Sequence, residues 1–156
     1  MKKLIIATVL LMFAAVTFCQ NSSNMEKEKE AIKAVIEEET NAFKDRDLDR
    51  VKATYLMDET TTRLNTTSGF NLMEGWETLG SGFSEFLKDN PEPVKNTEVK
   101  SNYRIKLYND CAWVIFDEDV PNVESGSMDK ALGLNLLEKV EGNWKIVFLG
   151  RIPIEE

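Results

Sequence analysis

The chain has 156 residues, with 19 basic and 27 acidic side chains, no histidine and a net charge of −8 at pH 7. A net negative surface of this size disfavours nucleic acid and anionic membranes as partners. The absence of histidine excludes every mechanism that depends on an imidazole. The sequence also lacks a Gly-rich phosphate loop and a Cys/His cluster, so it predicts neither a cofactor nor a metal.

The first nineteen residues have the pattern of an export signal. Two lysines precede an apolar run over residues 4–16, which is too short to span a bilayer comfortably. The sequence therefore predicts an exported protein, periplasmic or secreted, with residues 1–19 removed as a signal peptide. Alternatively, Cys19 resembles the acylated cysteine of a bacterial lipoprotein, although Phe18 departs from that pattern. A lipid anchor at Cys19 is the only membrane contact that we expect.

The first half of the mature chain has helical patterns. Residues 20–24 are predicted to be a linker, and 25–156 suit one domain with its own core. Apolar residues recur at helical spacing over 25–44, and Asp47 is a good N-cap for a second helix. The Thr-rich stretch 59–67 predicts a modest strand, and a third helix follows over about 75–88.

The second half alternates as β-structure. Strands are predicted over about 98–107, 111–120, 130–140 and 144–152, and Gly142 marks the turn of the last hairpin. This order of elements predicts the α+β class.

Cys111 is expected to be a small buried apolar residue. Because the strand after it is apolar on both faces, including Trp113 and Ile115 on one, we expect a homodimer through the outer sheet face.

Five segments carry a resemblance to a known family. They are the first amphipathic helix over 25–44, Asp47-Leu48-Asp49-Arg50-Val51, Glu74-Gly75-Trp76-Glu77, Ala112-Trp113-Val114 and Gly142-Asn143-Trp144-Lys145-Ile146. The ordered set resembles the nuclear transport factor 2-like superfamily and, within it, the polyketide-cyclase (SnoaL)-like group. The resemblance implies a cone-shaped, curved antiparallel sheet wrapped around N-terminal helices, and frequent dimerisation. It does not fix an activity, because members of the superfamily include both enzymes and binding modules, so function must be argued from the pocket.

The expected pocket is mainly apolar. Strict alternation from Trp144 places Ile146, Phe148 and Gly150 on the inward face of the last strand. We therefore predict a binding protein for a small apolar or amphipathic molecule. The predicted ligand-binding residues are Tyr55, Trp76, Asn135, Trp144 and Phe148. Core packing remains the alternative role for Tyr55 and Trp76, and an outward-facing amide the alternative for Asn135.

Two carboxylates provide the rival interpretation, an isomerase or dehydratase. A period of two places Asp117 with Trp113 and Ile115, and Glu118 on the opposite face. A carboxylate in an apolar pocket has a raised pKa and can act as a general acid or base. The simpler interpretation is a solvated strand end, and the acidic run 37–39 likewise suggests a solvated helix face. A third possibility is a filled cone that serves only as an interaction module.

Overall fold

The computed structural model describes residues 24–66, 69–95, 98–121 and 128–154. The predicted signal, 1–19, and residues 20–23 of the predicted linker lie outside the described residues. The chain divides into two compact units, residues 1–33 and 34–156. In the first, residues 24–33 are helical, and the second contains the elements described below. None of the helices in the described ranges is long and apolar enough to cross a membrane.

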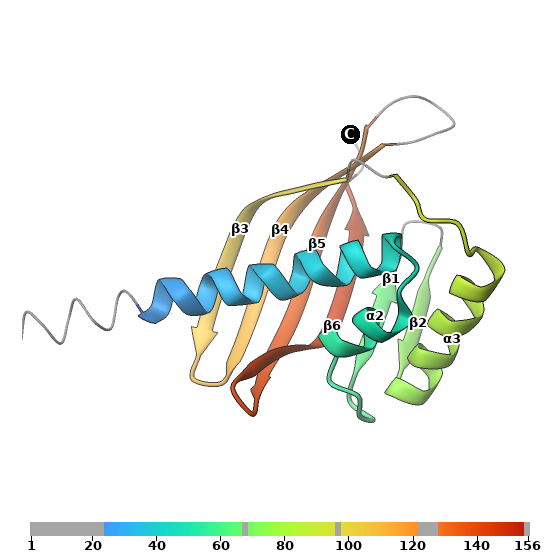
Figure 1. The fold of residues 1–156 in the computed structure, drawn as a ribbon. Coiled ribbons are helices and arrows are strands. Elements are labelled where there is room, and N and C mark those ends of the chain that lie inside the picture. The colour runs from blue at the N-terminus through green and yellow to red at the C-terminus, as the bar shows by residue number, and fades with distance from the viewer. Residues whose placement is uncertain (1–23, 67–68, 96–97, 122–127, 155–156) are drawn as a thin grey trace, which may run out of the picture. The chain divides into compact units, whose positions relative to one another are not determined.

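The second unit contains three helical segments close to those predicted (Figure 1). The first covers 34–44, and it is followed by α2 (Leu48–Thr54) and α3 (Trp76–Asp89). Asp47 caps α2, since its side chain accepts a hydrogen bond of 3.0 Å from the Arg50 backbone N–H. Helix α3 buries an apolar stripe at helical spacing, formed by Leu79, Phe83 and Leu87.

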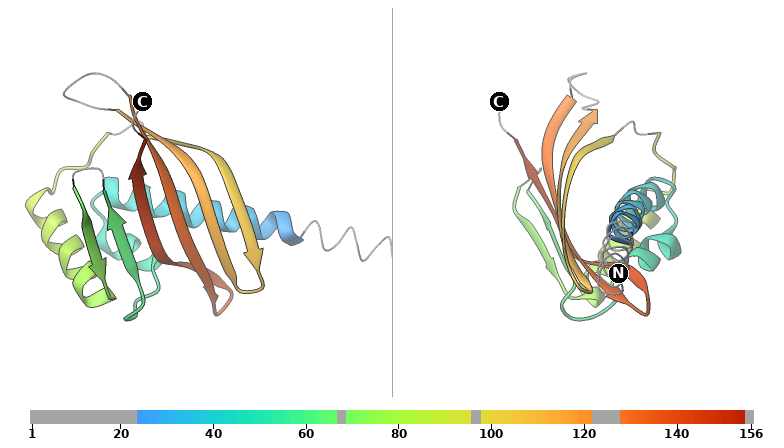
Figure 2. Two further views of the ribbon diagram at one scale, coloured as in Figure 1. Left: turned by 180° about the vertical axis from the view of Figure 1, so that it is seen from behind. Right: turned by 90° about the vertical axis from the view of Figure 1, so that its left-hand side faces the viewer.

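Six strands form one curved sheet in the order β2-β1-β6-β5-β4-β3 (Figures 1 and 2). The strands are β1 (Thr62–Asn65), β2 (Asn71–Glu74), β3 (Val99–Tyr108), β4 (Cys111–Pro121), β5 (Met128–Val140) and β6 (Asn143–Pro153). The predicted α+β class is confirmed, with two differences. Strand β2 was not predicted, and β1 pairs with β6 in parallel, whereas the other pairings are antiparallel. Pairing between segments so far apart in sequence leaves no local signal of direction.

A β-bulge divides β6 into two parts. Leu137 pairs with Ile146, but the neighbouring Leu136 pairs with Phe148, so Val147 is an extra residue on β6. One extra residue reverses the face on which every later side chain lies. The prediction from strict alternation is therefore correct for Trp144 and Ile146, which are buried, and wrong beyond the bulge.

The residues after the bulge exchange their predicted faces. Leu149 and Arg151 pair with Asn135 and Gly133, which lie on the inward face of β5. Phe148 shares the outer face with Leu136, its register partner, which is exposed. The predicted inward position of Phe148 is therefore wrong. An arginine, rather than a phenylalanine, faces the interior here.

Two expectations for β4 are also wrong. Cys111 is exposed, because it opens the strand beside the turn and lies on the outer face. Glu118 is not at a frayed end, because β4 continues to Pro121 and Glu118 itself pairs with Lys100 on β3 and Ala131 on β5. The Glu118 residue is only 7 % exposed and lies on the same face as Phe116.

Candidate functional site

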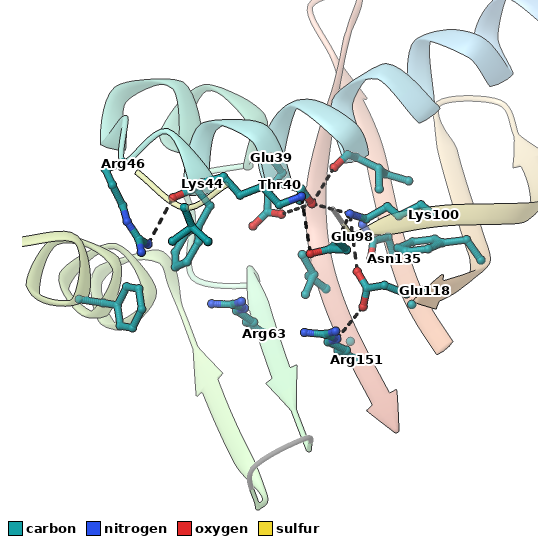
Figure 3. A pocket seen from close by; sticks show the side chains of 18 residues that line it. Glu39, Thr40, Lys44, Arg46, Arg63, Glu98, Lys100, Glu118, Asn135 and Arg151 are labelled. Carbon is teal, nitrogen blue, oxygen red and sulfur yellow. Dashed lines mark hydrogen bonds and ion pairs between the residues drawn. The ribbon is translucent and has the colours of Figure 1, made fainter. Parts of the chain in front are cut away.

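A cavity of about 290 Å³ lies within the second unit, between the helix over 34–44 and the inward face of the sheet (Figure 3). Its walls combine apolar side chains with five cationic and three carboxylate side chains. The apolar part comes from Ile36, Phe43, Phe86, Val94, Phe116 and Leu149. The charged part comes from Lys44, Arg46, Arg63, Lys100, Arg151, Glu39, Glu98 and Glu118. Cations therefore outnumber carboxylates inside a chain whose net charge is −8.

At one end of the cavity, carboxylates and cations form what we call the ion cluster: Lys44, Glu98, Lys100, Glu118 and Arg151. The Lys100 ammonium lies 2.5 Å from Glu98 Oε1 and 3.6 Å from Glu118 Oε1. Arg151 Nε lies 2.6 Å from Glu118 Oε2, and Lys44 Nζ lies 3.9 Å from Glu98 Oε2. The Arg151 contact is an ion pair without hydrogen-bond geometry at Nε. Each cation in this cluster therefore has a carboxylate beside it.

The two carboxyl groups of the ion cluster differ in proton affinity. Burial raises the pKa of Glu118 to about 7, and the hydrogen bond with Glu98 acts in the same direction, while Arg151 and Lys100 oppose it. Burial also disfavours ionisation of Glu98, but the hydrogen bond with Glu118 and the Lys100 ammonium hold its pKa below the ordinary value. Glu118 is therefore the member of the pair that holds a proton more readily.

At the other end lies the arginine–phenylalanine cluster, which consists of Phe43, Arg46, Arg63 and Phe86. The two rings stack with centroids 5.3 Å apart. The Arg46 guanidinium carbon lies 5.8 Å and 5.4 Å from the centroids of Phe43 and Phe86, and that of Arg63 lies 5.7 Å from Phe43. Within the described part of the chain, neither arginine forms an ion pair with a carboxylate. Aromatic faces rather than acids lie against these two cations, and Arg46 Nε also donates a hydrogen bond of 3.0 Å to the backbone carbonyl of Glu92.

Asn135 is the least satisfied polar side chain in the cavity wall. It is 1 % exposed, and neither Nδ2 nor Oδ1 has a hydrogen-bond partner among the described residues. Its register neighbours are Val114 on β4 and Leu149 on β6, and neither has a polar side chain. Buried amides are nearly always hydrogen-bonded in folded proteins. The Asn135 amide therefore has unused hydrogen-bonding capacity at the cavity wall.

The structure places the predicted site residues in different surroundings. Asn135 and Glu118 line the cavity. Tyr55 is buried behind it and donates a hydrogen bond of 3.0 Å to Glu39 Oε1, and burial raises the pKa of its phenol well above the ordinary value. Trp76 packs its ring 5.7 Å from that of Tyr55. Trp144 is buried in the core and is not among the cavity-lining residues.

Asp117 points away from the cavity. Its Oδ1 lies 2.9 Å from Arg104 Nη2, and its Oδ2 accepts a hydrogen bond of 2.7 Å from Asn102. The Asn102 hydrogen bond and the Arg104 guanidinium lower the pKa of Asp117. This carboxylate is therefore engaged on the outer face, and of the two predicted acids only Glu118 reaches the cavity.

Sequence reasoning missed most of the charged wall. Glu39 had a usable signal, because it lies three residues after Ile36 and four before Phe43, on the apolar stripe of the helix. The expectation of a solvated face is wrong for Glu39, which is 6 % exposed. Neither Lys100 nor Arg151 could be found from alternation, because a register shift between Ser101 and Arg104 in β3 and the bulge in β6 set the faces on which they lie.

The comparisons with solved structures identify the fold. A nuclear transport factor 2-like protein of unknown function from Pseudomonas putida is 13% identical, with 85% of this chain and 89% of that chain covered and a TM-score of 0.66. A nuclear transport factor 2-like protein from Cytophaga hutchinsonii is 15% identical, with coverages of 81% and 98% and a TM-score of 0.60. A CaMKII hub from S. rosetta is 18% identical, with coverages of 80% and 95% and a TM-score of 0.64.

No protein-family model and no curated protein matches the chain. At these identities the likeness defines the fold and leaves the activity open. The narrower polyketide-cyclase-like assignment stays a prediction. The chain has the nuclear transport factor 2-like fold, as the order of its five sequence segments predicted.

Proposed function

We propose that the protein binds a small amphipathic anion in the cavity. The observation that carries this proposal is the charge of the wall, where five cations face three carboxylates in a chain of net charge −8. Cations gathered in a concave site of low dielectric constant concentrate an anion more strongly than the same charges spread over a surface. A cavity of about 290 Å³ also argues against a filled interior.

The two ends of the cavity differ in which part of such a ligand they can bind. The cations of the ion cluster already have carboxylate neighbours, so they add little attraction for another anion. Arg46 and Arg63 lie against aromatic rings and keep their capacity to bind a carboxylate. The apolar body of the ligand would lie along Phe43, Phe86 and Leu149, which line the same space.

Titration with benzoate tests this proposal. We expect a Kd in about the millimolar range or tighter for a ligand of this size, measured by isothermal titration calorimetry on the full mature chain. Arg63→Gln should weaken binding at least about tenfold because one charge-assisted contact is lost. The matched control is Arg104→Gln, since Arg104 is paired with Asp117 on the outer face. No binding to the wild type, or equal losses in both variants, would overturn the proposal.

A second candidate function is acid–base catalysis by Glu118. The observation that favours it is a buried carboxyl in the cavity with a pKa raised to about 7, near the value at which a general acid or base is most effective. An isomerase or dehydratase activity that Glu118→Gln abolishes, while benzoate affinity stays within about twofold, would favour this enzyme over a simple binding protein. Turnover that survives Glu118→Gln would exclude Glu118 from catalysis.

We also propose that two copies pair through the outer sheet face. That face carries half-buried Trp113 and Ile115 beside Leu136, which is 44 % exposed. An exposed apolar sheet face of this kind is stabilised when it is buried, and the same face of a second copy of the chain can bury it. Sedimentation velocity at tens of micromolar should show a dimer, and Leu136→Lys should give monomers. A wild-type monomer at that concentration would contradict this proposal.

The export route is the last part of the proposal, and it rests on the two lysines and the apolar run over residues 4–16. We expect the mature chain to begin at Gln20, or at Cys19 carrying a lipid. Intact mass of the protein from its native host distinguishes these forms. A mass that retains residues 1–18 would contradict export.

A further inference from the structure

We infer that the ligand of this cavity carries, besides its negative charge, a planar amide edge in which an N–H donor and a carbonyl acceptor lie side by side. This inference rests on the proposed function, since it specifies the same ligand further. The class that combines both features in a small body is an anionic lactam or cyclic imide.

The inference starts from the Asn135 side chain. A primary amide has a carbonyl oxygen that accepts and an NH₂ group that donates, and here neither atom has a partner among the described residues. Val114 and Leu149 flank it in the sheet with apolar side chains, so the sheet itself cannot satisfy it. The side chain is 1 % exposed, so bulk water does not reach it freely. Asn135 also lines the cavity, which leaves a ligand as its partner.

The chemistry of Asn135 limits what that partner can be. An ionised carboxylate only accepts hydrogen bonds, so it can pair with Nδ2 but leaves Oδ1 unsatisfied. An apolar group satisfies neither atom. A cis-amide edge offers a donor and an acceptor in one plane, and asparagine can pair with it through two parallel hydrogen bonds, as it pairs with the donor and acceptor of an adenine edge in DNA recognition.

The position of Arg63 explains why the same ligand should also carry a negative charge. Arg63 pairs with Leu149, which in turn pairs with Asn135, so the two polar residues lie on adjacent inward positions of β1, β6 and β5. Their backbones are two strand spacings apart, about 10 Å. Arg63 Nε is also buried without a hydrogen-bond partner in the described part of the chain. One small ring with a carboxylate at one end and an amide edge at the other would satisfy both side chains.

Orotate and benzoate form a matched pair of probes. Both are planar six-membered rings with one carboxylate, and only orotate carries lactam edges. We expect wild-type protein to bind orotate at least about tenfold more tightly than benzoate, because a site built to hydrogen-bond a group discriminates against the analogue that lacks it. Asn135→Leu, similar in size but without polar atoms, should remove this preference, so that the variant binds orotate no more than about twofold more tightly than benzoate. Thermal melting of the variant checks that it is folded.

Each outcome of this titration has one meaning. Benzoate binding that depends on Arg63 but without an orotate preference would leave the proposed function standing and overturn the amide-edge inference, with a bound water as the partner of Asn135. An orotate preference that survives Asn135→Leu would also overturn it, because a group other than Asn135 would then form the hydrogen bonds with the amide edge of orotate. Failure of both probes to bind would overturn the proposed function itself.

Discussion

The two ends of the cavity handle positive charge in opposite ways. In the ion cluster, Lys100 and Arg151 lie beside carboxylates that are almost fully buried. In the arginine–phenylalanine cluster, Arg46 and Arg63 lie over aromatic rings and have no carboxylate partner in the described residues. The difference separates two roles. A cation that neutralises a buried acid is needed for folding, whereas a cation with no acid beside it remains available to a ligand.

Removing Lys100 should have the largest effect on stability, and it tests whether the ion cluster is needed for folding. Its side chain is 4 % exposed and lies between Glu98 and Glu118. Lys100→Met should lower the free energy of unfolding by about 3–5 kcal/mol, since it leaves buried carboxylates without their shared cation. Urea denaturation measures the loss. The control is Arg104→Gln, an exposed pair that should cost about 1 kcal/mol or less, and similar losses in both variants would contradict the role assigned to the ion cluster.

The pH dependence of stability should also come from the ion cluster. Because the pKa of Glu118 is raised in the folded state, the folded chain holds a proton that the unfolded chain has lost between about pH 4.5 and 7. The contribution of Glu118 to stability is therefore complete below this window and is lost as pH rises through it, by on the order of 1–3 kcal/mol. Glu118→Gln cannot titrate and should flatten the curve. Urea midpoints at several pH values provide the test, and an unchanged slope in the variant would count against it.

Gly133 tests how tightly the wall beside the ion cluster is packed. A Cβ at this position would lie 2.1 Å from Phe116 Cζ, and Lys100 Nζ lies 5.9 Å from the centroid of that ring. Gly133→Ala should therefore destabilise the fold by about 1–3 kcal/mol through overpacking. Thermal unfolding measures it. Gly82→Ala is the control, since its nearest contact would be an ordinary 3.4 Å and alanine favours the helix; a neutral Gly133→Ala would show that the ring moves freely.

The smallest effect on stability is expected at the arginine–phenylalanine cluster. Arg46→Gln removes a half-exposed guanidinium from two ring faces and should cost only about 0.5–1 kcal/mol. The same variant should still weaken benzoate binding measurably by calorimetry. A large loss of stability with unchanged benzoate binding would show that the arginine–phenylalanine cluster serves folding rather than ligand binding.

The elements of this fold could be predicted from local patterns. The N-cap residue Asp47 correctly predicted the start of α2, and the long strands β3 to β6 begin and end within two residues of the expected bounds. The glycine-centred hairpin is also confirmed, because Glu141 and Gly142 both have positive φ. The short strand β2 was missed, since four exposed or half-buried residues give no clear alternation.

The candidate site was harder to predict, for a physical reason. Glu118 and Asn135 follow from alternation because β4 and β5 pair without a break in register. The charged residues opposite them come from elements far apart in the sequence, and β1 meets β6 only through tertiary structure. Period-two reasoning assumes an unbroken strand, so it placed Phe148 inward and overlooked Arg151.

The bulge at Val147 makes the chemistry of the cavity depend on how β6 pairs with β5 as well as on its composition. If the same residues paired without a bulge, strict alternation from Ile146 would turn Phe148 inward and Arg151 outward. No side chain would have been substituted, yet Glu118 would lose the cation beside it. Deleting Val147 would keep the present faces, because Phe148 would then follow Ile146 directly and still face outward. The bulge therefore decides whether this strand lines the cavity with a charged or with an apolar side chain.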